Sequence, residues 1–306
     1  MRAVTYPAYS TDFSTLEVGD RPDPKVAPSA VLIEVKAAGV NPVDWKMMAG
    51  GLDGLVDSVF PVVPGWDVAG VVAAVGPDTP EFAVGDEVMA YARKEINHGG
   101  TFAELVAVPA VAVARKPTSL SFEEAAGLPL AGGTALRTLD ALQVGEGDTV
   151  LIHAAAGGVG SFGVQIAVAR GARVIGTASA ANHDYLRSLR AEPVAYGDGV
   201  VERIRELAPA GVDAVADFVG GQLEPSLAVL ADSGRLASIA DPSVIEHGGR
   251  WIWVRPDGTE TARLAALADE GELEVEVART FGLDDVGEAF ALSRSGHVRG
   301  KLIIVP

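Results

Sequence analysis

The sequence predicts an α/β protein in two parts, a β-rich part followed by a doubly wound parallel sheet. Short β-type segments separated by Pro-Gly, Gly-Asp and Gly-Gly pairs fill roughly the first 120 residues, which is typical of a barrel or a sandwich. Strands and helices then alternate strictly from residue 149 onward. The chain has 306 residues, of which 48% are apolar, so it can bury the cores of two domains.

The β-rich part ends at Ser121, where the pattern becomes helical. Ser121 and Glu124 have the spacing of a capping box, which predicts that a helix begins there. We expect this helical stretch to break at residues 129–133, which contain a proline and two glycines. The strands predicted before it are residues 30–40, 68–76, 86–92 and 102–110.

The alternating part is typical of a parallel sheet with helices on both faces. Its strands are nearly continuous apolar runs, as expected when both faces of a sheet are covered. From residue 257 a helix, a strand, a second helix and a terminal strand close the chain, and the pattern alone allows them to finish either domain. The predicted strands are residues 149–154, 173–177, 193–196, 212–219, 235–240 and 250–254, and the predicted helices are residues 159–170, 182–190, 200–208 and 222–231.

Composition excludes several classes of function. Lysine and arginine total 24 against 41 aspartates and glutamates, a net charge of −17 that disfavours nucleic acid or an anionic membrane as a partner. The absence of cysteine excludes disulfides, thiolate nucleophiles and sulfur-ligated zinc, and the five histidines are too scattered to predict a metal site. With no signal sequence and no long apolar run, we expect a cytoplasmic protein.

The stretch HAAAGGVGSFG, residues 153–163, joins a predicted buried strand to a helix. Gly157, Gly158 and Gly160 would let backbone amides approach a pyrophosphate, and the helix N-terminus adds about half a positive charge. Ala154 stands where the usual fingerprint has its first glycine. The bare pattern also fits a tight turn, but its position at the start of alternating strands and helices favours a dinucleotide site.

The end of the second predicted strand bears on the choice of dinucleotide. Residues 177–179 contain no acidic side chain that could hold a ribose 2′-hydroxyl, which argues against NAD. Ser179, Asn182 and His183 could bond a 2′-phosphate, although Asn182 and His183 could equally cap the next helix, and the loop contains no lysine or arginine. We therefore predict NADPH, with NADH less favoured.

Seven stretches together resemble the medium-chain dehydrogenase/reductase superfamily, and within it the zinc-free quinone oxidoreductases related to zeta-crystallin. They span nearly the whole chain in the family's order. The family's phosphate loop has the form AxxGxxG, so Ala154 matches it. The matching stretches are residues 37–50, 63–76, 85–90, 99–110, 128–136, 148–167 and 297–306.

The resemblance implies a two-domain fold without zinc. A GroES-like β-barrel catalytic domain would comprise residues 1–120 and 257–306, and a Rossmann NADP-binding domain would comprise residues 121–256. Zinc-dependent members carry a cysteine where this chain has Asn41, and a histidine in the motif that here contains Trp66 and Asp67. A zinc-free site favours an acceptor that is already electron-poor.

The resemblance also implies an enzyme that transfers hydride from NADPH to a quinone or an α,β-unsaturated carbonyl. Asn41, Trp45 and Lys46 are the catalytic candidates, with Lys46 as a proton donor or a substrate anchor. The predicted cofactor contacts are Asn41, Asp44 and Thr134 at the nicotinamide end, Gly157, Gly158, Val159 and Gly160 at the pyrophosphate, Ser179 and Tyr196 at the adenosine, and Phe218, Val219 and Lys301 along the cofactor.

Several of these residues, and Asp67 near them, also have a purely structural interpretation, and Lys46 could be an exposed lysine without a specific role. Asn41 could shape a turn before Pro42, Trp45 and Tyr196 could be packing residues, Asp67 could satisfy buried amides, and Lys301 could charge a strand edge.

Two other functions compete with quinone or enone reduction. One is enoyl-thioester reduction, although such enzymes often have a tyrosine in the segment where this chain has Trp45, Lys46 and Met47. The other is a nucleotide-binding scaffold without turnover. We also expect a homodimer, because in relatives the last strand of the nucleotide-binding domain pairs with the same strand of a second copy, and residues 251–254 are the candidate for that strand. The alternative is that residues 251–254 form an internal strand.

Overall fold

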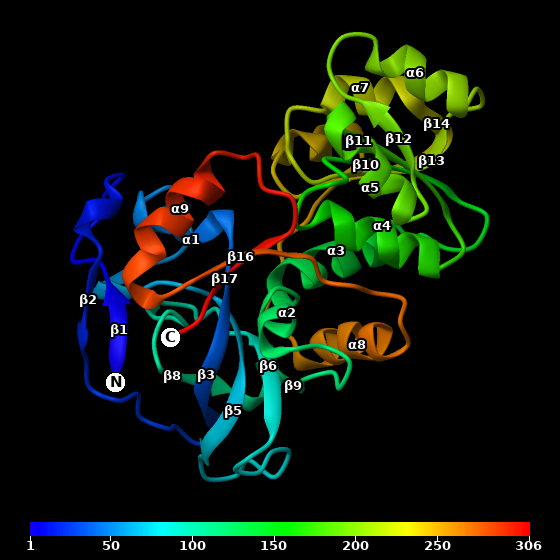
Figure 1. Cartoon of the computed structure of the whole chain (residues 1–306). Helices are drawn as coiled ribbons and strands as arrows, with labels where there is room; N and C mark the ends of the chain where they lie inside the picture. Colours follow the sequence, from blue (N-terminus) through cyan, green and yellow to red (C-terminus); the bar gives the residue numbers. More distant parts are fainter. The chain divides into compact units, whose positions relative to one another are not determined.

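The polypeptide leaves its first unit at Leu130 and returns to it at Arg255. The computed structural model describes residues 1–306, with Met1–Leu130 and Arg255–Pro306 in the first unit and Ala131–Val254 in the second (Figure 1). The sequence placed the boundary at Ser121. In the structure the helix that begins after Ser121 contacts strands of the first unit and belongs to that unit.

A seven-stranded sheet organises the first unit, in the order β16-β17-β3-β5-β6-β9, with β8 also paired to β3. The last strand of the chain lies antiparallel to β3, with Leu302 opposite Val40. This pairing brings the C-terminal segment into the first unit. The bounds are β3 Ala30–Val40, β5 Asp67–Val75, β6 Glu87–Tyr91, β8 Leu105–Pro109, β9 Val113–Arg115, β16 Val277–Phe281 and β17 Lys301–Ile304.

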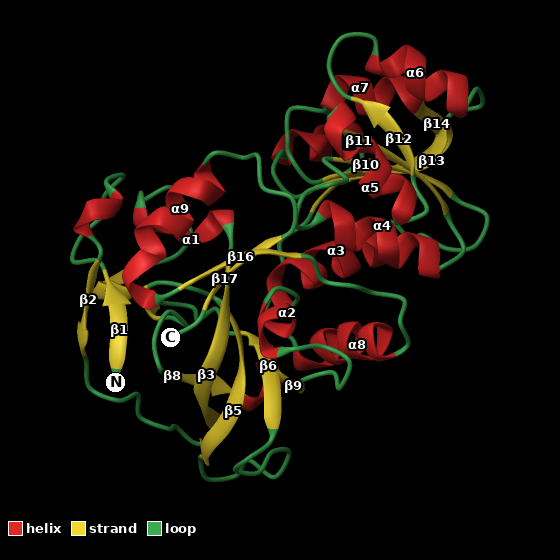
Figure 2. Cartoon of the chain, in the orientation of Figure 1, coloured by secondary structure: helices red, strands yellow, loops and turns green.

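Two small sheets, four α-helices and short 3-10 turns complete the first unit (Figure 2). Its core is apolar, and Phe290 packs edge-on against Phe13 and contacts Phe102. The paired strands are β1 Arg2–Thr5 with β2 Glu17–Asp20, and β4 Ser58–Val63 with β7 Asn97–Gly99; the helices are α1 Pro42–Met48, α2 Phe122–Ala126, α8 Gly258–Asp269 and α9 Val286–Arg294.

Six parallel strands form the sheet of the second unit, in the order β12-β11-β10-β13-β14-β15. This is the doubly wound Rossmann order, so the predicted fold class is confirmed. The strands are β10 Thr149–His153, β11 Arg173–Ala178, β12 Glu192–Ala195, β13 Val212–Asp217, β14 Leu230–Ser238 and β15 Arg250–Trp251, and the helices are α3 Pro129–Ala141, α4 Gly160–Ala169, α5 His183–Ser188, α6 Val200–Leu207 and α7 Leu223–Val229.

Two predicted elements differ in detail from the structure. The helical stretch does break near Pro129, but the break lies at residues 127–128, between α2 and α3. Helix α3 begins at Pro129 and continues through Gly133, because proline fits the first turn of a helix, where its missing N–H has no partner to lose. Of the predicted strand 250–254, only Arg250 and Trp251 pair with β14. They form the edge of the sheet, and Trp251 and Trp253 are both exposed.

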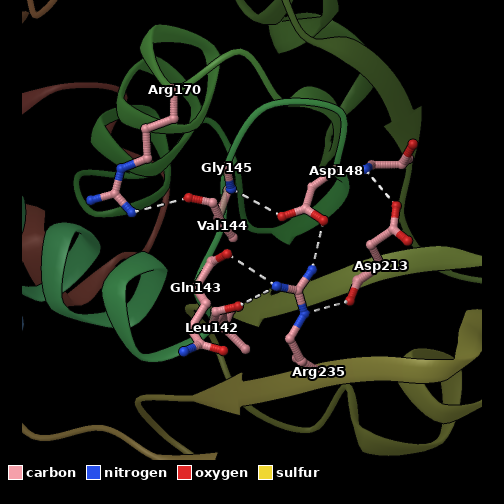
Figure 3. A network of polar contacts seen from close by, with 9 residues as sticks. Leu142, Gln143, Val144, Gly145, Asp148, Arg170, Asp213 and Arg235 are labelled. Atoms are coloured by element: carbon pink, nitrogen blue, oxygen red, sulfur yellow. Dashed lines mark hydrogen bonds and ion pairs between the residues drawn. The ribbon is translucent and has the colours of Figure 1, made fainter.

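Arg235, in β14, bonds to residues at the amino-terminal ends of β10 and β13 (Figure 3). Its guanidinium donates to the carbonyls of Leu142 and Gln143 at 2.8 and 3.0 Å and to the Asp148 carboxylate at 2.7 Å. Its Nε donates to the Asp213 carbonyl at 3.2 Å. β10 and β13 both begin beside Arg235 of β14. Arg235 therefore stabilises the end of the sheet that lies opposite the phosphate loop.

No helix of the structure is both long enough and apolar enough to cross a membrane.

A substitution at Gly70 in β5 tests how closely β3 and β5 pack. A Cβ at this position would lie 2.1 Å from the Glu34 carbonyl oxygen, whereas a Cβ at Gly19 in β2 would meet no atom within 4 Å. We expect Gly70→Ala to lower the free energy of unfolding by about 3 kcal/mol, and Gly19→Ala to change it by less than about 0.5 kcal/mol. Urea denaturation followed by fluorescence checks this, and equal midpoints for the two variants would contradict the packing described.

Candidate active site

The phosphate loop begins with an alanine in a backbone conformation that usually belongs to glycine. Ala154 has φ 54°, in the left-handed region, and its carbonyl accepts from the Gly157 N–H at 2.9 Å. A Cβ on Gly160 would lie 2.2 Å from the Ala154 carbonyl oxygen. Alanine at position 154 can therefore adopt the backbone conformation that the first glycine of the fingerprint usually adopts. Position 160, where α4 begins, has no room for a side chain and requires glycine.

The N-terminus of α4 offers unpaired backbone donors. Its N-cap residue, Val159, makes no side-chain capping bond, and Gly157, Gly158 and Val159 are only half-buried. The first amides of a helix have no partner within the helix, and together they bind phosphate readily. The loop thus fits the pyrophosphate of a dinucleotide.

His153, at the end of β10, holds this loop in place as a neutral side chain. Thr177 Oγ1 accepts from the Ala154 N–H at 3.2 Å and lies 3.3 Å from His153 Nδ1, while His153 Nε2 lies 3.2 Å from Ser226 Oγ. Ser226 donates its own proton to the Gln222 carbonyl, so Nε2 is the protonated nitrogen. Burial lowers the pKa of His153 to about 4, which keeps the ring uncharged.

Most of the other residues predicted to hold the cofactor in the second unit lie at the carboxyl ends of the parallel strands. Ser179, Tyr196 and Phe218 each directly follow the carboxyl end of a parallel strand, which is where such sheets bind ligands. Tyr196 and Val219 are largely exposed, at 64% and 54%. Thr134 lies in α3 and is buried.

Asp217 shapes the turn that carries Phe218 and Val219. Its carboxylate accepts from the N–H groups of Val219 and Gly220 at 3.0 and 2.9 Å, and from the Ser238 hydroxyl at 2.8 Å. We did not predict this residue. The signal that could have found it is an acidic side chain directly after the apolar residues 214–216, at the carboxyl end of a predicted strand.

The loop after β11 and the start of α5 contain one buried side-chain nitrogen without a hydrogen-bond partner. Asn182 donates to Ser179 Oγ at 3.3 Å, and Arg187 is paired with Asp184 at 2.6 Å. His183 Nε2 is buried and makes no hydrogen bond. Of the side chains in this loop, the imidazole of His183 is the one with an unsatisfied nitrogen.

In the first unit, a buried polar cluster forms where β3 ends and α1 begins. Lys301 Nζ donates to Asn41 Oδ1 at 2.7 Å, and Asn41 Nδ2 donates to Asp67 Oδ2 at 2.9 Å. The Asn41 backbone N–H donates to Asp44 Oδ2 at 2.7 Å, and Asp67 Oδ1 accepts from the Leu130 N–H at 2.8 Å. All four side chains, Asn41, Asp44, Asp67 and Lys301, are buried.

This arrangement fixes the side-chain amide of Asn41, because its oxygen faces a cation and its nitrogen faces a carboxylate. Asn41, Asp44 and Lys301 are among the residues predicted for the cofactor site, and the sequence predicts for Asp67 only a role in satisfying buried amides. Asp67 does accept from the Leu130 amide, but it also orients Asn41. Asn41 and Asp67 are 26 residues apart in the chain, so no local sequence pattern indicates that their side chains are in contact.

Burial changes the charge of the cluster. It raises the pKa of Asp44 to about 8 and that of Asp67 to about 6, and it lowers the pKa of Lys301. Asp44 is therefore mostly protonated at neutral pH. Its Oδ1 is buried with no hydrogen-bond partner, and an orphaned polar atom of this kind fits a polar group of a bound cofactor.

Trp45 and Lys46 lie on α1 outside this cluster. Trp45 Nε1 donates to Ser293 Oγ at 3.2 Å, and its ring packs against the core of the first unit. Lys46 is exposed, and its ammonium lies 5.5 Å from the centre of the Trp45 ring. No group of three or more histidine, aspartate or glutamate side chains is placed to hold a metal ion.

Comparison with known proteins gives a match over the whole chain. Residues 27–118 match the alcohol dehydrogenase GroES-like domain and residues 189–304 match a zinc-binding dehydrogenase family. A 2-methylene-furan-3-one reductase from Solanum lycopersicum is 35% identical over 100% of this chain and 79% of its own length. The chain belongs to the medium-chain dehydrogenase/reductase superfamily.

Other members of the superfamily are similar to this chain in sequence and in structure. An NADPH-dependent alkenal/one oxidoreductase from Arabidopsis thaliana is 34% identical over 92% of this chain and 74% of its own length. The structure of a quinone oxidoreductase from Coxiella burnetii superposes with a TM-score of 0.88 and 33% identity, covering 100% of this chain and 99% of that one. The predicted membership, and with it the prediction of an oxidoreductase, is confirmed.

Asp44→Asn tests the protonation of the buried cluster. Because the folded-state pKa of Asp44, about 8, lies above its ordinary value of 3.8, the folded protein keeps a proton that the unfolded chain releases. The free energy of unfolding should therefore fall as pH rises through this window. In Asp44→Asn, a neutral isostere, the fall between pH 5 and pH 8 should be smaller by at least about 1 kcal/mol.

Urea denaturation at the two pH values measures this difference. Asp67 and Lys301 remain in both proteins, so the comparison removes only one ionisable group from the cluster. An equal fall in the wild type and in Asp44→Asn would show that Asp44 is ionised in the folded protein.

Proposed function

We propose that the protein is an NADPH-dependent oxidoreductase that transfers hydride to a quinone or an α,β-unsaturated carbonyl. The observation that carries this proposal is the uncapped N-terminus of α4 behind the Ala154 turn, a preformed site for a dinucleotide pyrophosphate. Relatives named as enone and quinone reductases support the choice of acceptor. NADPH, when bound, supplies the hydride.

The residues of the chain then bind and orient the reactants. The amides at Gly158 and Val159 would hold the pyrophosphate, and Asn41 presents an amide in one fixed orientation. The buried Asp44 Oδ1 supplies a hydrogen-bonding group for the cofactor. Asn41 occupies the position that is a cysteine in zinc-dependent members, so the site suits an acceptor that is electron-poor without a Lewis acid.

We propose Lys46 as the group that stabilises the negative oxygen formed when the acceptor takes up hydride. Its ammonium is exposed and makes no ion pair, and the Trp45 ring beside it limits where it can move. A donor aimed at a developing oxyanion lowers the barrier more than it strengthens ground-state binding.

The loop after β11 supports NADPH over NADH. It has no carboxylate at residues 177–179 to bind a ribose hydroxyl, and the unsatisfied His183 Nε2 is a candidate partner for a 2′-phosphate. A relative named as NADPH-dependent is consistent with this choice.

The function is tested by NADPH binding and turnover in the wild type and two variants. Fluorescence titration should give a Kd well below 1 mM, a limit that corresponds to only about 4 kcal/mol. Gly158→Val, which fills the phosphate turn, should raise the Kd for NADPH about 30-fold, or about 2 kcal/mol. Lys46→Met should leave that Kd unchanged and lower kcat/KM for an enone about 100-fold.

Each variant is the control for the other, because one removes a cofactor contact and the other a substrate contact. Turnover is followed by NADPH absorbance with a quinone, an enone and an enoyl thioester. A Kd above about 1 mM for both NADPH and NADH would refute dinucleotide binding. Turnover of the thioester alone would make the protein an enoyl-thioester reductase.

We also propose that the protein is a homodimer joined at β15. This two-residue strand is the edge of its sheet, and the exposed Trp251 and Trp253 rings, 6.3 Å apart, lie beside it. An open edge with adjacent aromatic side chains is a ready surface for a second copy. Sedimentation velocity should show a dimer in the wild type and a monomer in Trp251→Ser; a monomeric wild type would contradict the proposal.

A further inference from the structure

A pocket of about 490 Å³ lies in the first unit, and none of the residues assigned to the candidate active site lines it. It is formed by the segment that follows β2, by β4, by the segment around β7 and by β8. Its volume is within the range that encloses a drug-sized ligand. Nothing in the proposed reaction uses this pocket.

The wall of the pocket is largely apolar. Prolines and branched aliphatic side chains from three segments of the chain converge on it, so an apolar ligand body would leave water when it enters. These residues are Pro22, Pro24, Pro61, Val63, Leu105 and Val106.

Cationic side chains outnumber carboxylates in this pocket. Arg21, Lys25 and Lys94 line it together with His98, against a single carboxylate, that of Asp23. This excess of positive charge is local, since the whole chain carries a net charge of −17. A pocket with this balance attracts an anion.

Two of the cations have hydrogen-bond donors that the protein does not satisfy. Lys94 donates to the Gly99 carbonyl at 2.6 Å and makes no ion pair, and burial lowers its pKa. Arg21 donates to Thr5 Oγ1 at 2.7 Å, and the Glu17 carboxylate lies 3.8 Å away, but its Nε is buried with no partner. Leaving charged donors unpaired beside apolar walls costs free energy that an anionic ligand would recover.

We propose that this pocket is a binding site for an amphipathic carboxylate. Lys94 and Arg21 hold the carboxylate through charge-assisted hydrogen bonds, and the proline and aliphatic wall covers the apolar body. Inorganic phosphate or a free nucleotide would leave that wall uncovered. The site is separate from dinucleotide binding and does not depend on it.

Isothermal titration calorimetry with octanoate, acetate and octan-1-ol separates the two halves of the site. Octanoate should bind the wild type with a Kd on the order of 0.1 mM. Acetate lacks the apolar body and octan-1-ol lacks the charge, so each should bind at least about tenfold more weakly. The octanoate Kd should be the same with and without saturating NADPH.

Lys94→Met keeps the length of the side chain and removes its charge, and should raise the octanoate Kd at least about tenfold. Lys25→Met, at an exposed position that cannot disturb the core, should raise it about threefold. Lys36→Met is the matched control, because Lys36 pairs with Glu34 outside the pocket, and it should leave the Kd unchanged.

Three results would overturn the proposal. They are the absence of octanoate binding in the wild type, an equal affinity for octan-1-ol, and an octanoate Kd that neither Lys94→Met nor Lys25→Met changes. A failure of NADPH to bind would bear on the proposed reaction alone, since octanoate is titrated independently of it.

Discussion

The hydrogen bond from Lys301 to Asn41 joins residues that are 260 positions apart in a region that water does not reach. A buried ammonium is costly unless acceptors and an opposite charge surround it. Asn41 supplies the acceptor, and Asp67 supplies the charge through the other side of the same amide. This requirement links the start of β17, the end of β3 and the start of β5, so the pairing of these three strands and the orientation of Asn41 depend on one another.

The parts of the fold that could be predicted from sequence depend on local signals. β3 has the predicted bounds because its apolar run ends at Asn41, and the Rossmann order follows from alternating strands and helices, whose crossovers are nearly always right-handed. The contacts of Asn41 with Asp67 and Lys301 could not be predicted, because only long-range strand pairing brings these residues together. The break in the helical stretch lies two residues before its predicted place, because Pro129 disrupts the interior of a helix but fits equally well at the start of one.

The phosphate loop shows that a glycine fingerprint describes backbone conformations rather than residue names. Ala154 adopts a left-handed φ at a cost of about 1 kcal/mol, and its N–H is held by Thr177. Gly160 has no such freedom, since any side chain would meet the Ala154 carbonyl. In the second unit, hydrogen bonds of the neutral His153 side chain support this turn. In the first unit, the orientation of Asn41 depends instead on hydrogen bonds with buried ionisable side chains.

The position of β17 has a consequence for synthesis on the ribosome. Until residues 301–304 emerge, Ala38–Val40 of β3 lack the partner they have in the folded sheet. At about 5–20 residues per second, the 260 residues between Asn41 and Lys301 take about 13–52 s to translate. The whole second unit is complete before then, so it can fold first while the first unit waits with an open strand edge. A nascent chain of this topology therefore needs that edge shielded for most of its translation.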